Sequence, residues 1–392
     1  MPVTRAQVGI VGAGPAGLTL AHLLHRAGIE TVILELRSRE YVEARVRAGV
    51  LEHDVAQLFE DAGVGERLRR DGLVHTGVEL QAAGERHRIA FDELTGKSIV
   101  VYGQTEIVKD LIEARLETGA PLLFDAEAVR LHDLEGEQPR IEYRHDGAEH
   151  ELVCDVVAGC DGFHGVSREA IPPGVLRTFA RDYPYGWLGI LAAVGPSSEE
   201  LVYAHHERGF ALLSMRSPEL SRLYLQCAPD EDLAAWPDER IWEELQTRLG
   251  VDGWTLHEGP ILEKGVTPMR SYVVEPMQWG RLFLAGDAAH IVPPTGAKGL
   301  NLAVRDVHVL ADAIVAWYGA GDRAQLDAYS ETCLRRVWRA EHFSWWMTTM
   351  LHRRPDGDDF DLRLQLSQLR YLRTSRVAAT SLAENYVGIE RV

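Results

Sequence analysis

Near its start the chain reads Gln7-Val8-Gly9-Ile10-Val11-Gly12-Ala13-Gly14-Pro15-Ala16-Gly17, and this stretch decides the fold. The β-branched run Gln7–Val11 predicts a short buried strand, and the glycines that follow it have the spacing G-x-G-x-x-G. An apolar helix is predicted over Gly17–Ala27 and a second strand over Thr31–Glu35. A strand–helix–strand unit of this kind implies a parallel sheet.

The glycine spacing predicts a dinucleotide site made by Gly12, Gly14, Ala16, Gly17 and Glu35. In such a turn the first glycine permits the tight bend, the second lets the backbone approach a pyrophosphate, and the third lets helix and strand pack closely. The helix N-terminus offers N–H groups and a favourable dipole to the phosphates. The carboxylate at the end of the second strand accepts hydrogen bonds from ribose hydroxyls.

The glycine motif alone leaves FAD and NAD open as cofactors. Its place at the start of the chain, together with a second strand–turn motif at Gly286-Asp287, favours FAD, because a long flavin cofactor needs contacts from two distant segments.

The remaining sequence predicts two further regions. A buried strand is expected over Val153–Gly159, a helix over Thr105–Leu116, and alternating patterns from Tyr183 to Pro268 indicate an antiparallel sheet. A strand over Arg281–Ala285 and helices over Leu300–Trp317 and Arg335–Leu351 follow. We therefore expect an α/β fold with a Rossmann-like, mostly parallel FAD-binding domain (1–180, continued by 269–318), an antiparallel substrate-binding sheet (181–268) and a helical C-terminal interface region (319–392).

Composition excludes several classes of protein. The 392 residues carry 41 basic and 59 acidic side chains, a net charge of −18, which argues against a nucleic-acid or anionic-membrane surface. The four cysteines show no C-x-x-C spacing, so neither a metal site nor a dithiol pair is indicated, and a reducing cytoplasm is the expected compartment. The apolar stretch Val8–Leu24 is interrupted by glycines and lacks the basic start of a signal peptide, and no membrane span is expected.

Three later segments resemble motifs of the group A flavoprotein monooxygenases. Ala158–Gly165 resembles their D-G motif, and Arg281–His290 resembles the G-D motif that holds the flavin ribityl and ribose. Ile291–Asn301, with Ile190–Ala193 and Ala383–Gly388, narrows the resemblance to the members that act on 4-hydroxybenzoate. The resemblance runs from about Val8 to Gly388, so it is more specific than a shared fold.

This resemblance implies a homodimeric enzyme of aromatic catabolism. It would hydroxylate 4-hydroxybenzoate at the 3-position to 3,4-dihydroxybenzoate, using FAD, NADH or NADPH, and O2, through a flavin C4a-hydroperoxide. A related hydroxylated or amino benzoate is the alternative substrate. A flavin-dependent disulfide reductase, which needs a C-x4-C pair that this sequence lacks, and a non-catalytic FAD-binding protein are the alternatives of other classes.

The resemblance also assigns the substrate site. Arg216 would bind the substrate carboxylate through its planar fork, with Ser214 and Tyr224 as hydroxyl partners. A phenol has a pKa near ~10, so a proton relay is needed at neutral pH. That relay would consist of Tyr203, then Tyr386, then His75, and the Pro294 carbonyl would orient the phenol.

The same resemblance implies two sets of cofactor residues. The helix predicted from Leu300 would direct its N-terminal dipole at the flavin. The flavin set beyond the glycine turn is Arg45, Gln104, Asp161, Asp287, Thr295, Gly299, Leu300 and Asn301. The set for nicotinamide binding or flavin movement is Arg37, Tyr41, Arg47, His164, Arg168 and Arg270, with Arg222 beside them.

One departure from the family pattern concerns the reductant. Family members that use NADPH strictly carry Arg-Gln after the glutamate, whereas this chain has Leu36-Arg37. Leucine cannot bind a 2′-phosphate, so we expect NADH to be used as well as, or in preference to, NADPH.

Overall fold

The computed structural model describes residues 2–45 and 49–388. A six-stranded sheet, parallel except at one edge, forms its first layer in the order β19-β20-β13-β2-β3-β9. The strands are β2 (Val8–Val11), β3 (Thr31–Leu34), β9 (Leu122–Leu123), β13 (Val156–Gly159), β19 (Gln278–Trp279) and β20 (Leu282–Leu284). The predicted strand–helix–strand unit and its parallel pairing are confirmed.

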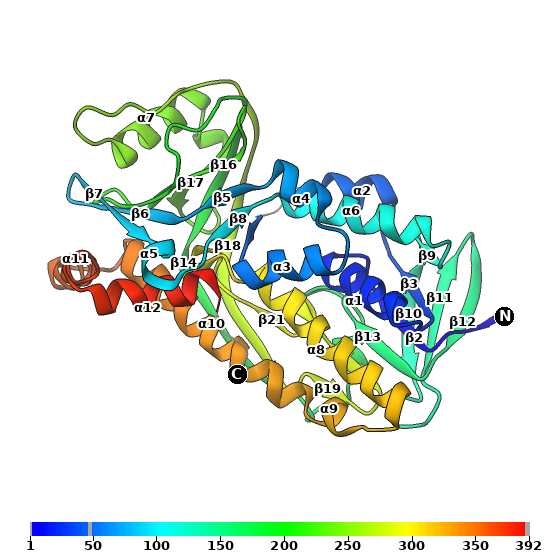
Figure 1. Ribbon diagram of the computed structural model, residues 1–392. Helices are drawn as coiled ribbons and strands as arrows, with labels where there is room; N and C mark the ends of the chain where they lie inside the picture. Colours follow the sequence, from blue (N-terminus) through cyan, green and yellow to red (C-terminus); the bar gives the residue numbers. More distant parts are fainter. Residues whose placement is uncertain (1, 46–48, 389–392) are drawn as a thin grey trace.

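Helices cover one face of this sheet and a second sheet covers the other (Figure 1). The helices are α1 (Pro15–Arg26), α6 (Gln104–Glu117) and α8 (Gly299–Ala320). The four-stranded sheet runs in the order β1 (Val3–Arg5), β12 (Ala148–Val153), β11 (Arg140–His145) and β10 (Glu127–His132). A Cβ on Gly9 would meet Ile141 at 2.8 Å, which shows how closely the two sheets pack.

The single strand predicted over Val153–Gly159 is wrong at its start. Val153 ends β12 in the four-stranded sheet, and β13 begins at Val156 in the six-stranded sheet. Between them the Cys154 amide donates to Pro139 and the Asp155 amide to Gln7. The chain therefore changes sheets here, although the apolar run is continuous because both strands are buried.

An eight-stranded sheet forms the other half of the molecule (Figure 1). It is antiparallel except where β15 pairs with β6. Its order is β21 (His290–Ile291), β18 (Ile261–Glu275), β14 (Arg177–Ala192), β17 (Leu220–Cys227), β16 (Ala211–Ser217), β15 (Leu201–His205), β6 (Gly77–Ala82) and β7 (Glu85–Ala90). The antiparallel sheet expected from the alternating patterns is confirmed, and it also takes two strands from residues 77–90.

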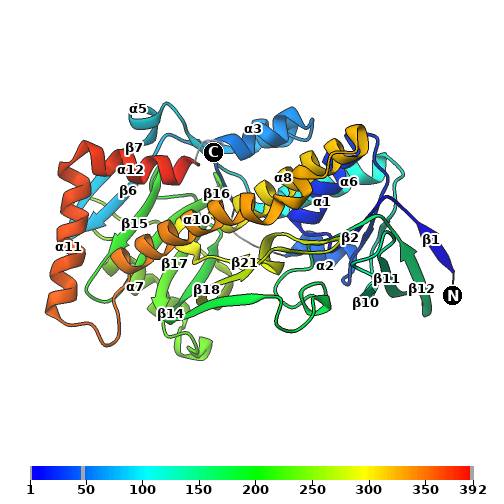
Figure 2. The ribbon, with the colours of Figure 1, turned by 90° about the horizontal axis from the view of Figure 1, so that it is seen from below.

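Two apolar cores stabilise opposite faces of this sheet. On one face Leu188, Val202 and Leu213 pack against Trp236 and the helix α7 (Asp238–Leu249). On the other face Tyr203 and Leu212 belong to a core shared with α10 (Tyr329–Leu351), α11 (Asp359–Thr374) and α12 (Arg376–Val387). Figure 2 shows α10 running along the molecule from α8 to α11, so it joins the two halves.

Short elements complete the fold. A three-stranded sheet is formed by β4 (Val50–Leu51), β8 (Ile99–Val101) and β5 (Leu73–His75). The remaining helices are α2 (Arg39–Ala44), α3 (His53–Asp61), α4 (Glu66–Asp71), α5 (Phe91–Thr95) and α9 (Ala324–Asp327), and the 3-10 turns are η1 (Arg168–Ala170), η2 (Leu233–Ala235), η3 (Gly286–Ala288) and η4 (Pro294–Gly296). In the part of the chain that the structure describes, every helix is too short or too polar to cross a bilayer.

The two glycines at the start of α1 should differ in their effect on stability. A Cβ on Gly17 would lie 2.0 Å from the Gly12 carbonyl oxygen, whereas a Cβ on Gly14 meets nothing within 4 Å. We predict that Gly17→Ala lowers the free energy of unfolding by about 3 kcal/mol. Gly14→Ala, the matched control, should cost about 1 kcal/mol or less. Urea denaturation of the protein without bound ligands measures both, and equal losses would contradict the close contact.

Candidate active site

The turn between β2 and α1 has the geometry that a phosphate site requires. Gly12 has φ +102°, and a Cβ there would lie 2.4 Å from the Cys160 carbonyl oxygen, so glycine is needed for both conformation and space. Gly14 precedes Pro15, the first helical residue, and the space around its α-carbon is open. The N–H groups at the start of α1 therefore face a region that a phosphate can enter.

Glu35, directly after β3, lies against this turn. Its Oε2 accepts the Ala13 amide at 2.7 Å and its Oε1 accepts the Arg37 amide at 2.8 Å. These bonds fix the carboxylate, and each oxygen keeps a lone pair that can accept a ribose hydroxyl. The Thr105 hydroxyl, next in sequence to the predicted residue Gln104, donates to the carbonyl of the predicted residue Arg45 at 3.3 Å.

The second segment, η3, lies between α1 and α8. Gly286 has φ +62°, and its Cβ position is 3.8 Å from Ala16 and 3.1 Å from Ala303. Asp306, buried in α8, holds this turn by accepting the Gly286 amide at 3.0 Å and the His290 ring at 2.6 Å. The Asp287 side chain is exposed beside α1, as a ribose ligand must be.

Asp161 stabilises the segment that follows β13. Its Oδ2 accepts the Ser167 amide at 2.8 Å, and burial raises the pKa of its carboxyl group. Its direct contact with a cofactor stays a prediction.

The loop before α8 is held by buried polar contacts. Ala297 has φ +54°, a left-handed conformation that is costly for alanine and that turns the chain into the helix. Asn301 bonds three backbone groups, accepting the Glu52 amide at 2.9 Å and donating to the Val50 and Ala297 carbonyls at 2.9 Å each. The space at the Gly299 α-carbon, at the start of α8, is open.

Several predicted flavin residues therefore act first on the protein itself. The Thr295 hydroxyl is buried and accepts from Thr348 at 2.9 Å, and Leu300 packs against the main core. Both N–H donors of the Asn301 side chain are used by the backbone. For these residues a flavin contact stays a prediction, and their observed effect is to fix the start of α8.

The predicted substrate residues lie on one face of the eight-stranded sheet. Tyr203 pairs with Leu212, which pairs with Tyr224, so these residues share a face. Ser214 follows Leu212 at a two-residue step on the same strand. Arg216 lies at a bulge between Met215 and Ser217, and its hydrogen bond with Tyr224 places it at the same face. This face is opposite to the one covered by α7.

Arg216 is half-buried on this face, and its Nε atom is buried. Burial lowers the pKa of its guanidinium, and the nearby positive charge of Arg222 acts in the same direction, whereas Tyr224 raises it as a hydrogen-bond partner. Its Nη1 also donates to the Met215 carbonyl at 3.2 Å. A buried guanidinium next to hydroxyl groups is suited to an anionic group that brings a charge of opposite sign.

Tyr203 and Tyr386 meet although they are far apart in sequence. Their hydroxyl oxygens are 2.5 Å apart, and both side chains are about 1% exposed. Burial raises the pKa of both phenols, so both stay protonated at neutral pH and can each donate and accept one hydrogen bond. This pair has the geometry of a proton-transfer step.

His75 ends β5 with 3% of its surface exposed, and its Nδ1 lies 3.0 Å from Glu200 Oε2. The Pro294 carbonyl accepts the Ala297 amide at 2.9 Å, which leaves one lone pair for another donor.

The comparisons with known proteins agree with this geometry. Residues 5–344 match the family described as FAD binding domain. The chain is 47% identical over 391 residues to the p-hydroxybenzoate hydroxylase of Acinetobacter baylyi, covering 99% of this chain and 96% of that protein. The chain belongs to the group A flavoprotein monooxygenases. The resemblance described from the sequence is thereby confirmed.

Solved structures show the same fold at low identity. The p-nitrophenol 4-monooxygenase of Pseudomonas putida superposes on this monooxygenase with a TM-score of 0.85 at 19% identity, covering 100% of both chains. An aklavinone-11 hydroxylase in complex with FAD and aklavinone gives a TM-score of 0.75 at 20% identity, covering 91% of this chain and 72% of that one. The predicted α/β fold class is confirmed.

The residues of the monooxygenase fit FAD. Three of its features follow the carboxyl ends of strands in the six-stranded sheet: the open position at Gly14, the fixed Glu35 carboxylate and the exposed Asp287 beside α1. The start of α8 completes the set. The cysteines give no support for disulfide-reductase chemistry. All four are free and buried, and burial raises the pKa of the Cys154 thiol to about 12 and that of Cys227 to about 11.

The predicted nicotinamide residues form two sets. Arg168 and Arg270 both stack over the Phe163 ring, at 4.9 and 5.1 Å, and the exposed His164 ring is 5.0 Å from it. Arg37 and Tyr41 form a second pair 5.2 Å apart beside the end of β3. Arg47 lies outside the described residues. Arg222 contacts Tyr224 at 3.4 Å, so the structure places it at the substrate face.

Four polar residues near the site were not predicted from the sequence. Lys298 is buried and donates to Glu52 at 2.6 Å and to the Tyr386 carbonyl at 3.0 Å. Glu200 and Arg88 contact each other beside His75, with Arg88 Nη2 2.8 Å from Glu200 Oε1. Glu52 and Lys298 are about 250 positions apart, and nothing in their local sequence marks the pairing; Glu200 could have been suspected from its place three residues before Tyr203.

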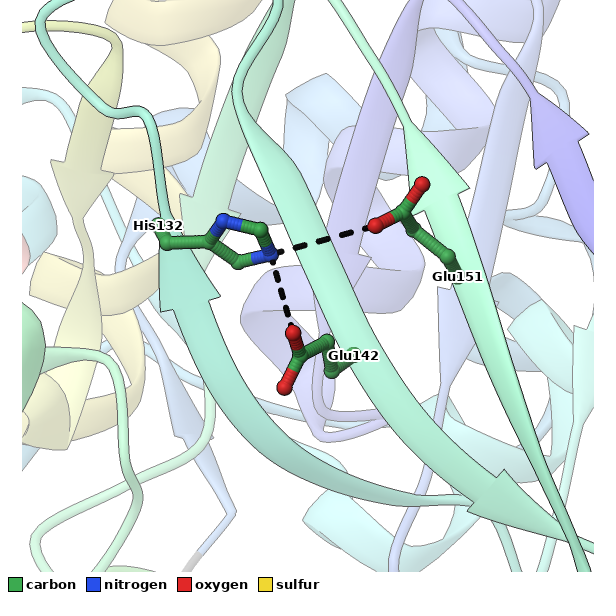
Figure 3. Close-up of side chains that lie close together, drawn as sticks. All are labelled: His132, Glu142 and Glu151. Atoms are coloured by element: carbon green, nitrogen blue, oxygen red, sulfur yellow. Dashed lines mark ion pairs between the residues drawn. The ribbon is translucent and has the colours of Figure 1, made fainter. Parts of the chain in front are cut away.

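One group of potential metal ligands lies outside the site, on the four-stranded sheet (Figure 3). His132 Nε2 is 3.3 Å from Glu142 and 4.0 Å from Glu151. Glu142 and Glu151 are direct cross-strand partners. Their like charges repel each other, and a nearby cation offsets that repulsion. Arg140 supplies one, 2.8 Å from Glu151, so the ion pairs account for this cluster.

Proposed function

We propose that this chain hydroxylates 4-hydroxybenzoate at the 3-position to give 3,4-dihydroxybenzoate, with FAD as cofactor and NAD(P)H and O2 as co-substrates. The observation that carries the proposal is a buried guanidinium, Arg216, on the same sheet face as the Tyr203–Tyr386 hydroxyl pair. The likeness to the p-hydroxybenzoate hydroxylase of Acinetobacter baylyi, which extends over nearly the whole of both chains, supports it.

The spacing of these groups suits the substrate. Tyr203 is level with Leu212, and Arg216 lies four residues further along β16, which is at most roughly 13 Å of strand because a bulge lies between Met215 and Ser217. A benzoate with a 4-hydroxyl group can lie along this distance when the two side chains lean toward it. Its carboxylate then meets Arg216 and Tyr224, and its phenol meets Tyr203.

When bound, FAD supplies hydride acceptance from NAD(P)H and the activation of O2 for transfer of one oxygen atom to the ring. The chain's own residues prepare the substrate. Arg216 orients the ring through the carboxylate, and Tyr203 accepts the phenolic proton while passing its own proton to Tyr386. Loss of that proton raises the electron density at the ring carbon next to the oxygen, which is the carbon that becomes hydroxylated.

The positive end of the α8 dipole favours negative charge at the flavin position. The chain fixes this helix start through Asn301 and Lys298. The core of α10 and α12 over the sheet face excludes water from the phenol.

Product analysis tests the proposed function directly. Purified protein should contain bound flavin, and 4-hydroxybenzoate should accelerate nicotinamide oxidation and yield 3,4-dihydroxybenzoate. A panel with 2,4-dihydroxybenzoate and 4-aminobenzoate separates the alternative substrates. Protein without bound flavin, or flavoprotein that does not respond to any benzoate, would contradict the proposal.

Arg216→Ala should weaken binding of 4-hydroxybenzoate by about 2–4 kcal/mol, because a buried carboxylate loses its charged partner. Titration of the bound flavin spectrum measures the affinity. Phenol, which lacks the carboxylate, is the control ligand and should bind the variant and the parent protein equally. Unchanged affinity for 4-hydroxybenzoate would show that the anchor is assigned to the wrong residue.

Tyr203→Phe should still allow reduction by NAD(P)H but release mostly hydrogen peroxide. The variant removes the hydroxyl that accepts the phenolic proton, and the ring stays too poor in electrons to be hydroxylated. The ratio of 3,4-dihydroxybenzoate formed to nicotinamide oxidised is the measurement. A ratio equal to that of the parent protein would rule out the relay through Tyr203.

Steady-state kinetics should show use of NADH at least as efficient as use of NADPH. Leu36 is 54% exposed where strict NADPH users carry arginine, and Arg37 stacks on Tyr41. The ratio of kcat/KM for the two nicotinamides decides the question. A large preference for NADPH would show that Arg37 or Arg39 replaces the missing contact.

We also propose a homodimer in the cytoplasm. In the C-terminal region Phe360 is 68% exposed, Leu364 55% and Tyr371 53%, all on α11, which supports a contact with a second copy there. The division into FAD-binding (1–180 and 269–318), substrate-binding (181–268) and interface (319–392) regions is part of the same proposal.

A further inference from the structure

His75 belongs to a line of polar contacts that leads away from the tyrosines. Its Nδ1 lies 3.0 Å from Glu200 Oε2, and Arg88 binds the other oxygen of that carboxylate through Nη2 at 2.8 Å and Nε at 3.2 Å. Arg88 Nη2 also donates to the Thr76 hydroxyl at 2.7 Å. His75 is 3% exposed and Arg88 is at the surface, so the line runs from the interior to solvent.

Glu200 is charged in this arrangement. Burial raises the pKa of its carboxyl group, but the hydrogen bonds from His75 and Arg88 outweigh burial and hold that pKa below its usual range. A carboxylate can only accept, so the hydrogen between His75 and Glu200 is on Nδ1. Nε2 is then the basic atom of the ring, and within residues 2–45 and 49–388 this buried atom has no hydrogen-bond partner.

Glu200 is also close to the relay tyrosines. It lies three residues before Tyr203, and its negative charge contributes, after burial and the contact with Tyr203, to the raised pKa of Tyr386. Arg88 from β7 is the charged group bound to this carboxylate, and Tyr386 from α12 is the titratable group on which its charge acts.

We propose that Glu200 and Arg88 are positioning residues of the proton relay. Glu200 fixes the tautomer of His75 so that Nε2 receives the proton that leaves the substrate phenol through Tyr203 and Tyr386, and Arg88 holds Glu200 in place and in the charged form. The O–H bond of the phenol breaks, an N–H bond forms at Nε2, and the proton then passes to solvent. This inference rests on the proposed function and adds the two residues that set the proton acceptor.

The two positioning residues should act with opposite signs. Both charges also act on the loss of the phenolic proton. Removing the negative charge of Glu200 makes loss of that proton easier, and removing the positive charge of Arg88 makes it harder. A change of charge in a partly buried site shifts such an equilibrium by about 1–3 pH units.

The test is the pH profile of substrate deprotonation, measured by the absorbance change of 4-hydroxybenzoate bound to the holoenzyme, together with kcat for hydroxylation. The acid limb should move to lower pH by about 1 unit in Glu200→Gln and to higher pH in Arg88→Met. Glu200→Asp, which keeps the charge, should restore most of the parent profile. Substrate affinity should stay within about twofold in all three variants, because neither residue contacts the substrate.

Glu85→Gln is the matched control, since Glu85 is an exposed residue at the start of the same strand β7. It should leave the profile unchanged. Shifts in the same direction for the Glu200→Gln and Arg88→Met variants, or no shift in either, would overturn the inference. Should the Glu200 variants not fold, the Arg88→Met profile alone decides between a shift to higher pH and none. Failure of the parent holoenzyme to hydroxylate 4-hydroxybenzoate would instead refute the proposed function.

Discussion

The proposed recognition of the substrate depends on a positive charge, the Arg216 guanidinium, that is largely buried in a sheet face. Moving a guanidinium from water into a protein interior costs free energy, and here Tyr224 offsets that cost only in part, because the net effect on the pKa of Arg216 is still a decrease. In the proposed function, a substrate carboxylate removes much of the remaining cost when it binds. The sheet that carries Arg216 is backed on its other face by the core beneath α7, which supports the strand of the guanidinium. The proposed selectivity for an aromatic acid follows from that arrangement.

The cofactor side and the substrate side are joined by a small set of buried polar contacts. Lys298 precedes α8, the helix that we propose faces the flavin, and it donates both to Glu52 and to the carbonyl of Tyr386. Asn301 ties the same helix start to the backbone of Val50 and Glu52. A displacement at the start of α8 would therefore also displace the tyrosine that meets Tyr203. In the proposed function, the residues next to the cofactor and those that deprotonate the substrate belong to one connected piece of structure.

Local patterns in the sequence predicted much of this. The glycine spacing, the following glutamate and the alternating strands were sufficient for the parallel sheet, the dinucleotide turn and the antiparallel sheet, because each depends on neighbours in sequence. The apolar run Val153–Gly159 was wrongly predicted as one strand, because an apolar sequence does not reveal that the chain passes from one sheet to another. The Lys298–Glu52 and Glu200–Arg88 contacts were missed for a related reason. Charged residues such as Lys298, Glu52 and Glu200 look like surface residues until tertiary structure shows the partner that permits their burial. Thr295 and Asn301 were predicted as flavin residues, and in the structure their side chains bond the protein itself.

A crystal structure of the holoenzyme with 4-hydroxybenzoate tests the central claim most directly. We predict that both carboxylate oxygens of the substrate lie within hydrogen-bond distance of the Arg216 guanidinium. The 4-hydroxyl group should be hydrogen-bonded to Tyr203, and the flavin ring should lie at the start of α8. A structure in which the Arg216 side chain faces bulk solvent, or in which the benzoate binds away from the flavin, would contradict it.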